Sequence, residues 1–148
     1  MYDQPRPNRA APAMTFDQML DRVRYEGAYP TRERAAEAVH DVLAALGRQL
    51  TGDERVDLAQ CLPVEAALTL TAQIPDTEHL TGWGFVKDLA EHTNTTPATA
   101  RWDTGAVLGV VARLAGPDLL TRTLRRLPDG YALLFGQSEL RRPEPAAA

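Results

Sequence analysis

The sequence has one cysteine, few aromatic side chains and no long apolar run, and each scarcity excludes a class of protein. A single cysteine, Cys61, cannot form an internal disulfide, which fits a reducing compartment. No apolar stretch reaches the length that crosses a bilayer, and no apolar leader follows the opening charges. We therefore expect a cytoplasmic protein with no membrane partner.

What is present favours packed helices. Aromatic residues make up only 6 % of the 148 residues, whereas apolar residues make up 44 % and are dominated by alanine and leucine. Alanine and leucine favour helix over strand, and the apolar content is enough for a sizeable core. The formal net charge of −4 argues against a protein dedicated to binding polyanions.

The chain resembles itself at a spacing of 65 residues, which is the kind of signal that identifies a repeat. In both copies a threonine precedes a long helical pattern, and a Leu-Pro step precedes a shorter one. The matched pairs are Thr31 and Thr96, Ala35 and Ala100, Val42 and Val107, Leu46 and Val111, Asp53 and Asp118, Leu62 and Leu127, and Pro63 and Pro128.

Apolar spacing predicts four helices in each copy. We expect an all-α fold of two pseudo-repeated four-helix units packed as one compact bundle. The units span 15–74 and 85–137, with a connector at 75–84 and disordered tails at 1–14 and 138–148. Each Leu-Pro step predicts a corner, because proline disfavours helix in the preceding leucine and suits the first position of the next helix.

The same segments carry a family resemblance. "FDQMLDRV" followed by "AAEAVHDVLAALGRQLTGDERVDLAQCLP", and then "FVKDLAEH" with "AVLGVVARLAGPDLLTRTLRRLP", resembles the bacterial all-helical family catalogued as domain-of-unknown-function 2267. The resemblance covers roughly residues 15–137 and implies a helical repeat fold. It implies no catalytic residue, because the family's function is unassigned.

The sequence lacks a coherent catalytic set. Glu37 and His40 have the spacing of a carboxylate-bridged metal site, but the matching positions hold Trp102 and Gly105, which bind no metal. Cys61 has no activating base nearby in the sequence, and no glycine-rich phosphate loop is present. We therefore expect a non-enzymatic protein without a metal or cofactor.

Two features favour a binding role. Arg122, Arg125 and Arg126 have helical i, i+3, i+4 spacing, so they share one face, and the second unit carries a formal charge of +1 against −4 for residues 15–70. Trp83, between two glycines, is the aromatic residue we expect to be exposed, whereas we place Trp102 in the interior.

Three functions remain open at this point. The first is an interaction module that binds a protein partner or a second copy of itself through Arg122, Arg125, Arg126 and Trp83. The second is a nucleic-acid-associated regulator that uses the same arginines on phosphate. The third is a small-molecule sensor with an apolar pocket between the units, lined by Trp83, Trp102 and Tyr131.

Overall fold

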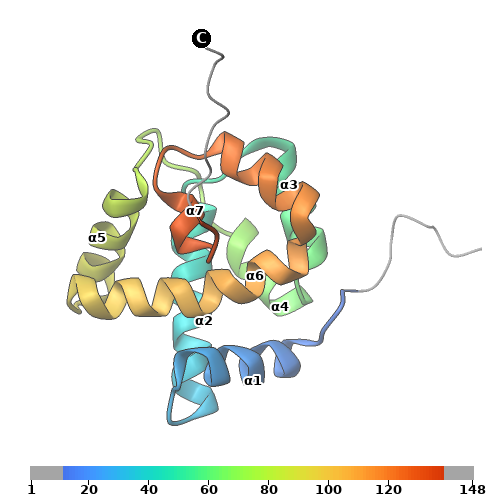
Figure 1. The fold of residues 1–148 in the computed structure, drawn as a ribbon, viewed down its shortest axis with the longest axis vertical. Coiled ribbons are helices and arrows are strands. Elements are labelled where there is room, and N and C mark those ends of the chain that lie inside the picture. The colour runs from blue at the N-terminus through green and yellow to red at the C-terminus, as the bar shows by residue number, and fades with distance from the viewer. Residues whose placement is uncertain (1–11, 139–148) are drawn as a thin grey trace, which may run out of the picture.

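The computed structural model describes residues 12–138, so most of both predicted tails lies outside the described residues. Within that range the chain is all-helical, as predicted, and the helices pack into one compact bundle (Figure 1). The helices are α1 (Phe16–Gly27), α2 (Arg32–Gly47), α3 (Gly52–Cys61), α4 (Val64–Thr71), α5 (Gly82–Thr93), α6 (Pro97–Arg126) and α7 (Tyr131–Leu134).

Threonine side chains begin the longer helices. The hydroxyls of Thr15, Thr31 and Thr96 each accept a hydrogen bond from a backbone N–H in the first turn of α1, α2 and α6 respectively. Such a bond satisfies one of the donors that a helix leaves free at its start. Thr31 and Thr96 thus precede long helices, as predicted, and Thr81 caps α5 in the same way as the other three.

The core lies around α2 and α6. Helix α2 packs against α1, α4, α5 and α6, and its Val42 and Leu46 are fully buried. Val107 and Val111 of α6, at the positions matched to them in sequence, are fully buried as well. Figure 1 shows α6 crossing α2 near the middle of the molecule. No helix of residues 12–138 is both long enough and apolar enough to span a membrane.

Helix α6 contains a break at Gly116. Gly116 has φ 82° and ψ 163°, a conformation that only glycine adopts without strain, and Pro117 follows it. The chain therefore turns within α6 without a connecting loop. The second half of α6, residues 117–126, then packs against α3.

The two Leu-Pro steps form corners, as predicted, but only one proline stands next to a helix. Leu62 and Leu127 are both extended and buried. Pro63 directly precedes α4, whereas the sequence predicted it as the first residue of that helix. The prediction that Pro128 opens a helix is wrong: α7 begins at Tyr131, after a turn in which Gly130 has φ 97°. The division into two repeated units stays a prediction.

Candidate binding site

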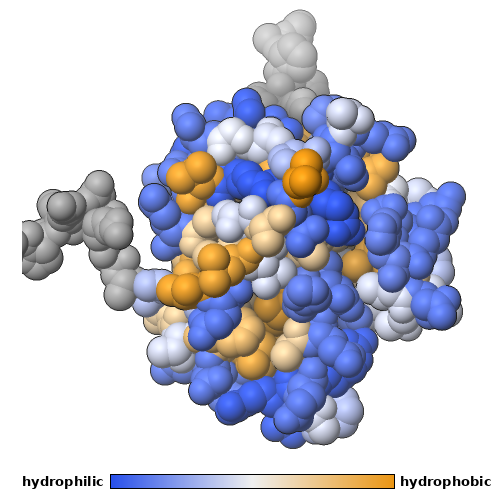
Figure 2. All heavy atoms as spheres, turned by 180° about the vertical axis from the view of Figure 1, so that it is seen from behind, coloured by the Kyte–Doolittle hydropathy of each residue, from blue (hydrophilic) through white to orange (hydrophobic). Residues whose placement is uncertain are grey.

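Helix α4 is apolar on two faces, and only one of them is covered. Ala66 and Leu70 are fully buried against the core. Val64 and Leu68, four residues apart and therefore neighbours on the helix surface, are 66 % and 62 % exposed. Figure 2 shows that apolar side chains on one side of the molecule gather into a patch rather than standing singly. Such clustering is typical of an interaction surface.

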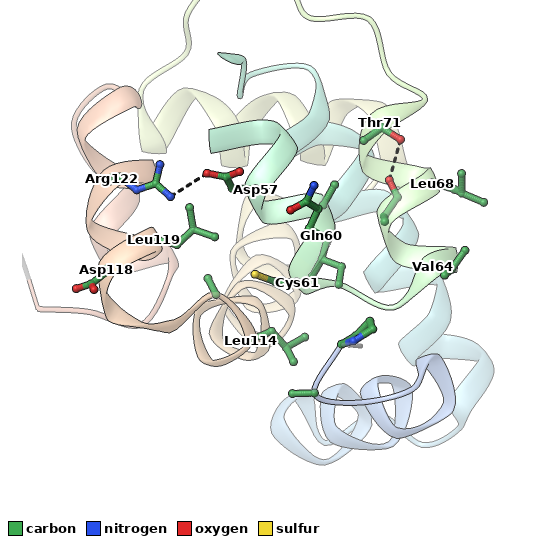
Figure 3. Close-up of a pocket in the computed structure, with 16 residues that line it drawn as sticks. Asp57, Gln60, Cys61, Val64, Leu68, Thr71, Leu114, Asp118, Leu119 and Arg122 are labelled. Atoms are coloured by element: carbon green, nitrogen blue, oxygen red, sulfur yellow. Dashed lines mark hydrogen bonds and ion pairs between the residues drawn. The ribbon is translucent and has the colours of Figure 1, made fainter. Parts of the chain in front are cut away.

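The exposed side of α4 forms one wall of a groove with a volume of about 910 Å³, which we call the α4 groove. Figure 3 shows Val64 and Leu68 on α4, Leu119 and Arg122 on α6, and Cys61 on α3 between them. The residues that line the α4 groove are Pro12, Ala13, Asp57, Ala59, Gln60, Cys61, Leu62, Val64, Ala67, Leu68, Thr71, Leu114, Ala115, Asp118, Leu119 and Arg122.

Three charged side chains line the α4 groove, two acidic and one basic. Arg122 donates from Nη2 to Oδ2 of Asp57 at 2.9 Å, across the seam between α6 and α3. Asp118 is exposed at the start of the second half of α6, and no ion pair among residues 12–138 involves it. The groove is therefore apolar with a small excess of negative charge.

Cys61 lines this groove but lacks the surroundings of a reactive thiol. Burial raises the pKa of Cys61, and the nearby Asp57 carboxylate raises it further. Both effects favour the neutral thiol over the nucleophilic thiolate. The geometry therefore gives Cys61 the role of a small apolar side chain in the groove lining.

The arginines singled out by the sequence lie at the seam between α3 and α6. Arg122 and Arg126 both pair with Glu54, at 3.5 Å and 3.3 Å, and Arg122 also pairs with Asp57. Arg125 is exposed, and within residues 12–138 it takes part in no ion pair. The difference in charge between the two halves is thus partly neutralised inside the molecule.

None of the three aromatic residues of the predicted pocket lines the α4 groove. Trp83 is 63 % exposed at the start of α5, as expected, but does not line the α4 groove. Tyr131 is buried, and its hydroxyl donates to the carbonyl of Leu80. Trp102, expected in the interior, is 58 % exposed, and its indole Nε1 donates to the carbonyl of Gly27 at 2.8 Å. Trp102 is exposed because it lies off the buried stripe of α6.

A second, shallower hollow of about 450 Å³ lies beside Trp102. There the Tyr29 hydroxyl donates to Asp103 at 2.6 Å, and Arg34 donates to the other carboxylate oxygen at 2.9 Å. Burial raises the pKa of Tyr29, and its hydrogen bond to Asp103 raises it further. Both carboxylate oxygens of Asp103 are engaged, so this cluster fastens α2 to α6 and offers no free acid or base.

The fold and the groove define the class of protein, which is an all-α bundle with an open apolar groove where α3, α4 and α6 meet. Residues 12–138 contain no cluster of three or more histidine, cysteine, aspartate or glutamate side chains that could hold a metal ion. The chain belongs to the family described as uncharacterized conserved protein (DUF2267), whose model matches residues 16–134, so the resemblance inferred from the sequence is confirmed. No curated protein matches it significantly.

Proposed function

We propose that the protein is a non-enzymatic interaction module that binds another protein through the α4 groove. The observation that supports this proposal is the pair Val64 and Leu68, about two-thirds exposed on the wall of an open apolar groove. Full burial of such a side chain contributes about 1.5–3 kcal/mol, so covering both would supply a useful part of a binding free energy.

The arginine contacts favour a protein partner over nucleic acid. A phosphate approaching Arg122 or Arg126 would have to compete with Glu54 and Asp57, which already pair with them. The same carboxylates would repel the phosphate. In the proposed complex Arg122 contacts the partner at the edge of the α4 groove. Trp83, outside the groove, is a candidate for a second contact with the same partner.

The experiment compares capture of proteins from native lysate by the tagged wild-type chain and by two variants. The double variant Val64→Asn with Leu68→Asn removes the apolar wall. The matched control Ile74→Asn makes the same kind of change at an 83 % exposed apolar residue outside the groove. We expect one set of proteins to be captured by the wild type and by Ile74→Asn but not by the double variant, with nuclease having no effect.

Other outcomes of this capture experiment would identify a different function. Equal capture by all three chains would exclude the α4 groove as the binding site. Loss of every captured protein on nuclease treatment would favour the nucleic-acid regulator instead. In that case Arg125→Glu becomes the next variant, because replacing Arg122 or Arg126 would also disrupt the seam with α3.

The volume of the α4 groove supports a second candidate, a sensor of a small apolar molecule. About 910 Å³ lies within the range of about 300–1,000 Å³ typical of small-molecule sites. The test is titration with the uncharged apolar dye Nile red. Saturable binding that raises Tm and is lost in the Val64→Asn, Leu68→Asn variant would support a sensor, and no binding would exclude this class of ligand.

A further inference from the structure

We infer that the α4 groove takes an amphipathic α-helix with apolar side chains on one face and Lys or Arg along its edge. This inference rests on the proposed function, because it names the kind of protein segment that the interaction module binds. The chemistry of the groove walls supports the inference, because it disfavours the binding of an extended or a proline-rich segment.

The walls disfavour an extended segment because they offer few backbone groups for pairing. Most lining residues belong to α3, α4 and α6, whose backbone N–H and C=O groups bond within the helices apart from the helix ends. An extended segment would bury its own polar backbone groups without partners, which is costly. A helix satisfies these groups internally and presents only side chains, as in other grooves that bind helices.

The lining also disfavours a proline-rich segment. Grooves that bind such segments are built from aromatic side chains, on which the prolines pack. None of the described residues that line the α4 groove is aromatic. Its apolar surface comes instead from aliphatic side chains such as Val64, Leu68 and Leu114, which suit the leucine-type anchors of an amphipathic helix.

The openness of the groove favours a helix over a small molecule. Small-molecule sites bury roughly 70–90 % of their ligand. Here Val64 and Leu68 remain about two-thirds exposed on one wall, so a small ligand against them would stay largely in water. A helix is about 10 Å across and several turns long, so it can cover more of an open apolar surface than a small ligand can.

Charge specifies the polar edge of the helix. The groove lining holds Asp57, Asp118 and Arg122, and Arg122 is already paired with Asp57 at 2.9 Å. Asp118 stands exposed at the α6 wall with no ion pair among the described residues. A lysine or arginine at the edge of the bound helix can pair with Asp118, whereas an acidic residue there would be repelled.

The test uses two synthetic helical peptides as probes. One carries leucine at i, i+3, i+4 and i+7 with lysine elsewhere, and the other has glutamate in place of every lysine. Binding to the full chain is followed by fluorescence anisotropy and by protection of Cys61, the single cysteine and a residue of the groove lining, against a thiol reagent. We expect the lysine peptide to bind and to protect Cys61, and the glutamate peptide to bind at least about tenfold more weakly.

Variants separate the groove from the rest of the surface. Val64→Asn with Leu68→Asn should weaken the lysine peptide about tenfold or more, while Ile74→Asn should leave its affinity unchanged. Asp118→Lys should weaken the lysine peptide and strengthen the glutamate peptide. No binding of the lysine peptide, binding that leaves Cys61 unprotected, or an equal loss in Ile74→Asn would overturn the inference.

The outcomes distinguish this inference from the proposed function. If proteins are captured from lysate only when Val64 and Leu68 are intact, but neither peptide binds, the proposed function stands and the helical, basic partner is wrong. If the lysine peptide binds with the expected dependence on Asp118 but capture does not depend on the groove, the chemistry of the groove is right and the proposed function is wrong.

Discussion

The guanidinium of Arg55, on α3, donates hydrogen bonds to five backbone carbonyls. The residue 65 positions later, in the second half of the chain, is Leu120, a buried leucine. These carbonyls lie near the C-terminal ends of α2 and α4, where helix dipoles leave partial negative charge. The acceptors are the carbonyls of Gly47, Leu50, Leu70, Thr71 and Gln73.

The same contrast recurs at a second pair of positions 65 residues apart. Asp41, half-buried on α2, is matched by the buried Ala106 on α6. Asp57 and Arg122 are themselves matched positions, and they pair with each other across the seam. At the positions of Arg55 and Asp41 the first half of the chain uses polar side chains where the second half uses buried apolar ones, so the two halves should respond differently to changes of charge.

The largest effect should come from removing the Arg55 guanidinium. Arg55→Met keeps much of the aliphatic stem but leaves five carbonyls without their shared donor. Hydrogen bonds to a charged group contribute about 1.5–3 kcal/mol each, and they are not additive. We expect the free energy of unfolding to fall by about 4 kcal/mol, measured by urea denaturation.

The matched control is Arg125→Met, the same substitution at an exposed arginine of the second half. It should change the free energy of unfolding by no more than about 0.5 kcal/mol. Similar losses in the two variants would contradict the contrast between the halves, because they would show that the Arg55 cluster of carbonyls adds no special stability.

Two glycine substitutions should give the next largest effects and differ in their cause. At Gly47 an added Cβ would clash with the carbonyl oxygen of Leu70, so α2 and α4 must move apart. At Gly116, with φ 82°, a Cβ would meet nothing within 4 Å, and only backbone strain opposes it. We expect Gly47→Ala to cost about 2–3 kcal/mol and Gly116→Ala about 1–2 kcal/mol.

Thermal denaturation of both glycine variants checks this order, and the α4 groove adds a second readout. Because Gly47→Ala displaces α4, which carries Val64 and Leu68, it should also change the rate at which a thiol reagent reaches Cys61. The reverse order of stabilities would mean that the break in α6, rather than the contact between α2 and α4, is the more constrained junction.

A smaller effect should follow from Glu54→Gln, which weakens both ion pairs that Glu54 makes with Arg122 and Arg126. Since the two arginines are about half exposed, salt should screen these pairs. We expect a loss of stability smaller than that of either glycine variant, seen at low salt and reduced at high salt. The control is Asp118→Asn, which removes an acidic group that makes no ion pair among the described residues. A loss of stability in Glu54→Gln that does not depend on salt would show that packing rather than charge joins α3 to α6.

The sequence predicted local features well because they depend on neighbouring residues. Threonine caps and Leu-Pro corners are set by backbone chemistry within a few positions, and both are present. The prediction that Trp102 lies in the interior rested on its place in a long helix and is wrong, because the helical period of Ala100, Thr104 and Val107 puts it off the buried stripe.

The candidate site was not predictable in the same way. Val64 and Leu68 are ordinary apolar residues of a helical pattern, and which face of α4 is left uncovered depends on how α3 and α6 pack around it. The arginine cluster was visible in the sequence, but the pattern could not distinguish an external partner from Glu54 and Asp57, which lie more than sixty residues away. Such contacts are set by tertiary packing rather than by local chemistry.

The smallest effect should be the pH dependence introduced by Asp41, the half-buried acid that corresponds to Ala106. Burial raises the pKa of Asp41, and Glu37 raises it to a lesser extent, while the nearby His40 lowers it. The folded state therefore holds the Asp41 proton more tightly than the unfolded state does. Ionisation of Asp41 costs stability, and this cost is absent below the pKa of the unfolded chain and complete above the pKa of the folded protein.

Asp41→Asn should therefore stabilise the protein at about pH 7 and leave it unchanged at about pH 3, where the carboxyl is protonated in both states. Because Asp41 is partly exposed, solvent screening should hold the gain below about 1 kcal/mol. Urea denaturation of the wild type and the variant at both pH values measures it, with Glu33→Gln as an exposed control on the same helix. An equal gain at both pH values would show that the stabilisation comes from the amide's own contacts. A gain in stability that grows with pH would show that the Asp41 charge, near the core of the first half, costs stability. The second half avoids this cost because it carries Ala106 at the corresponding position.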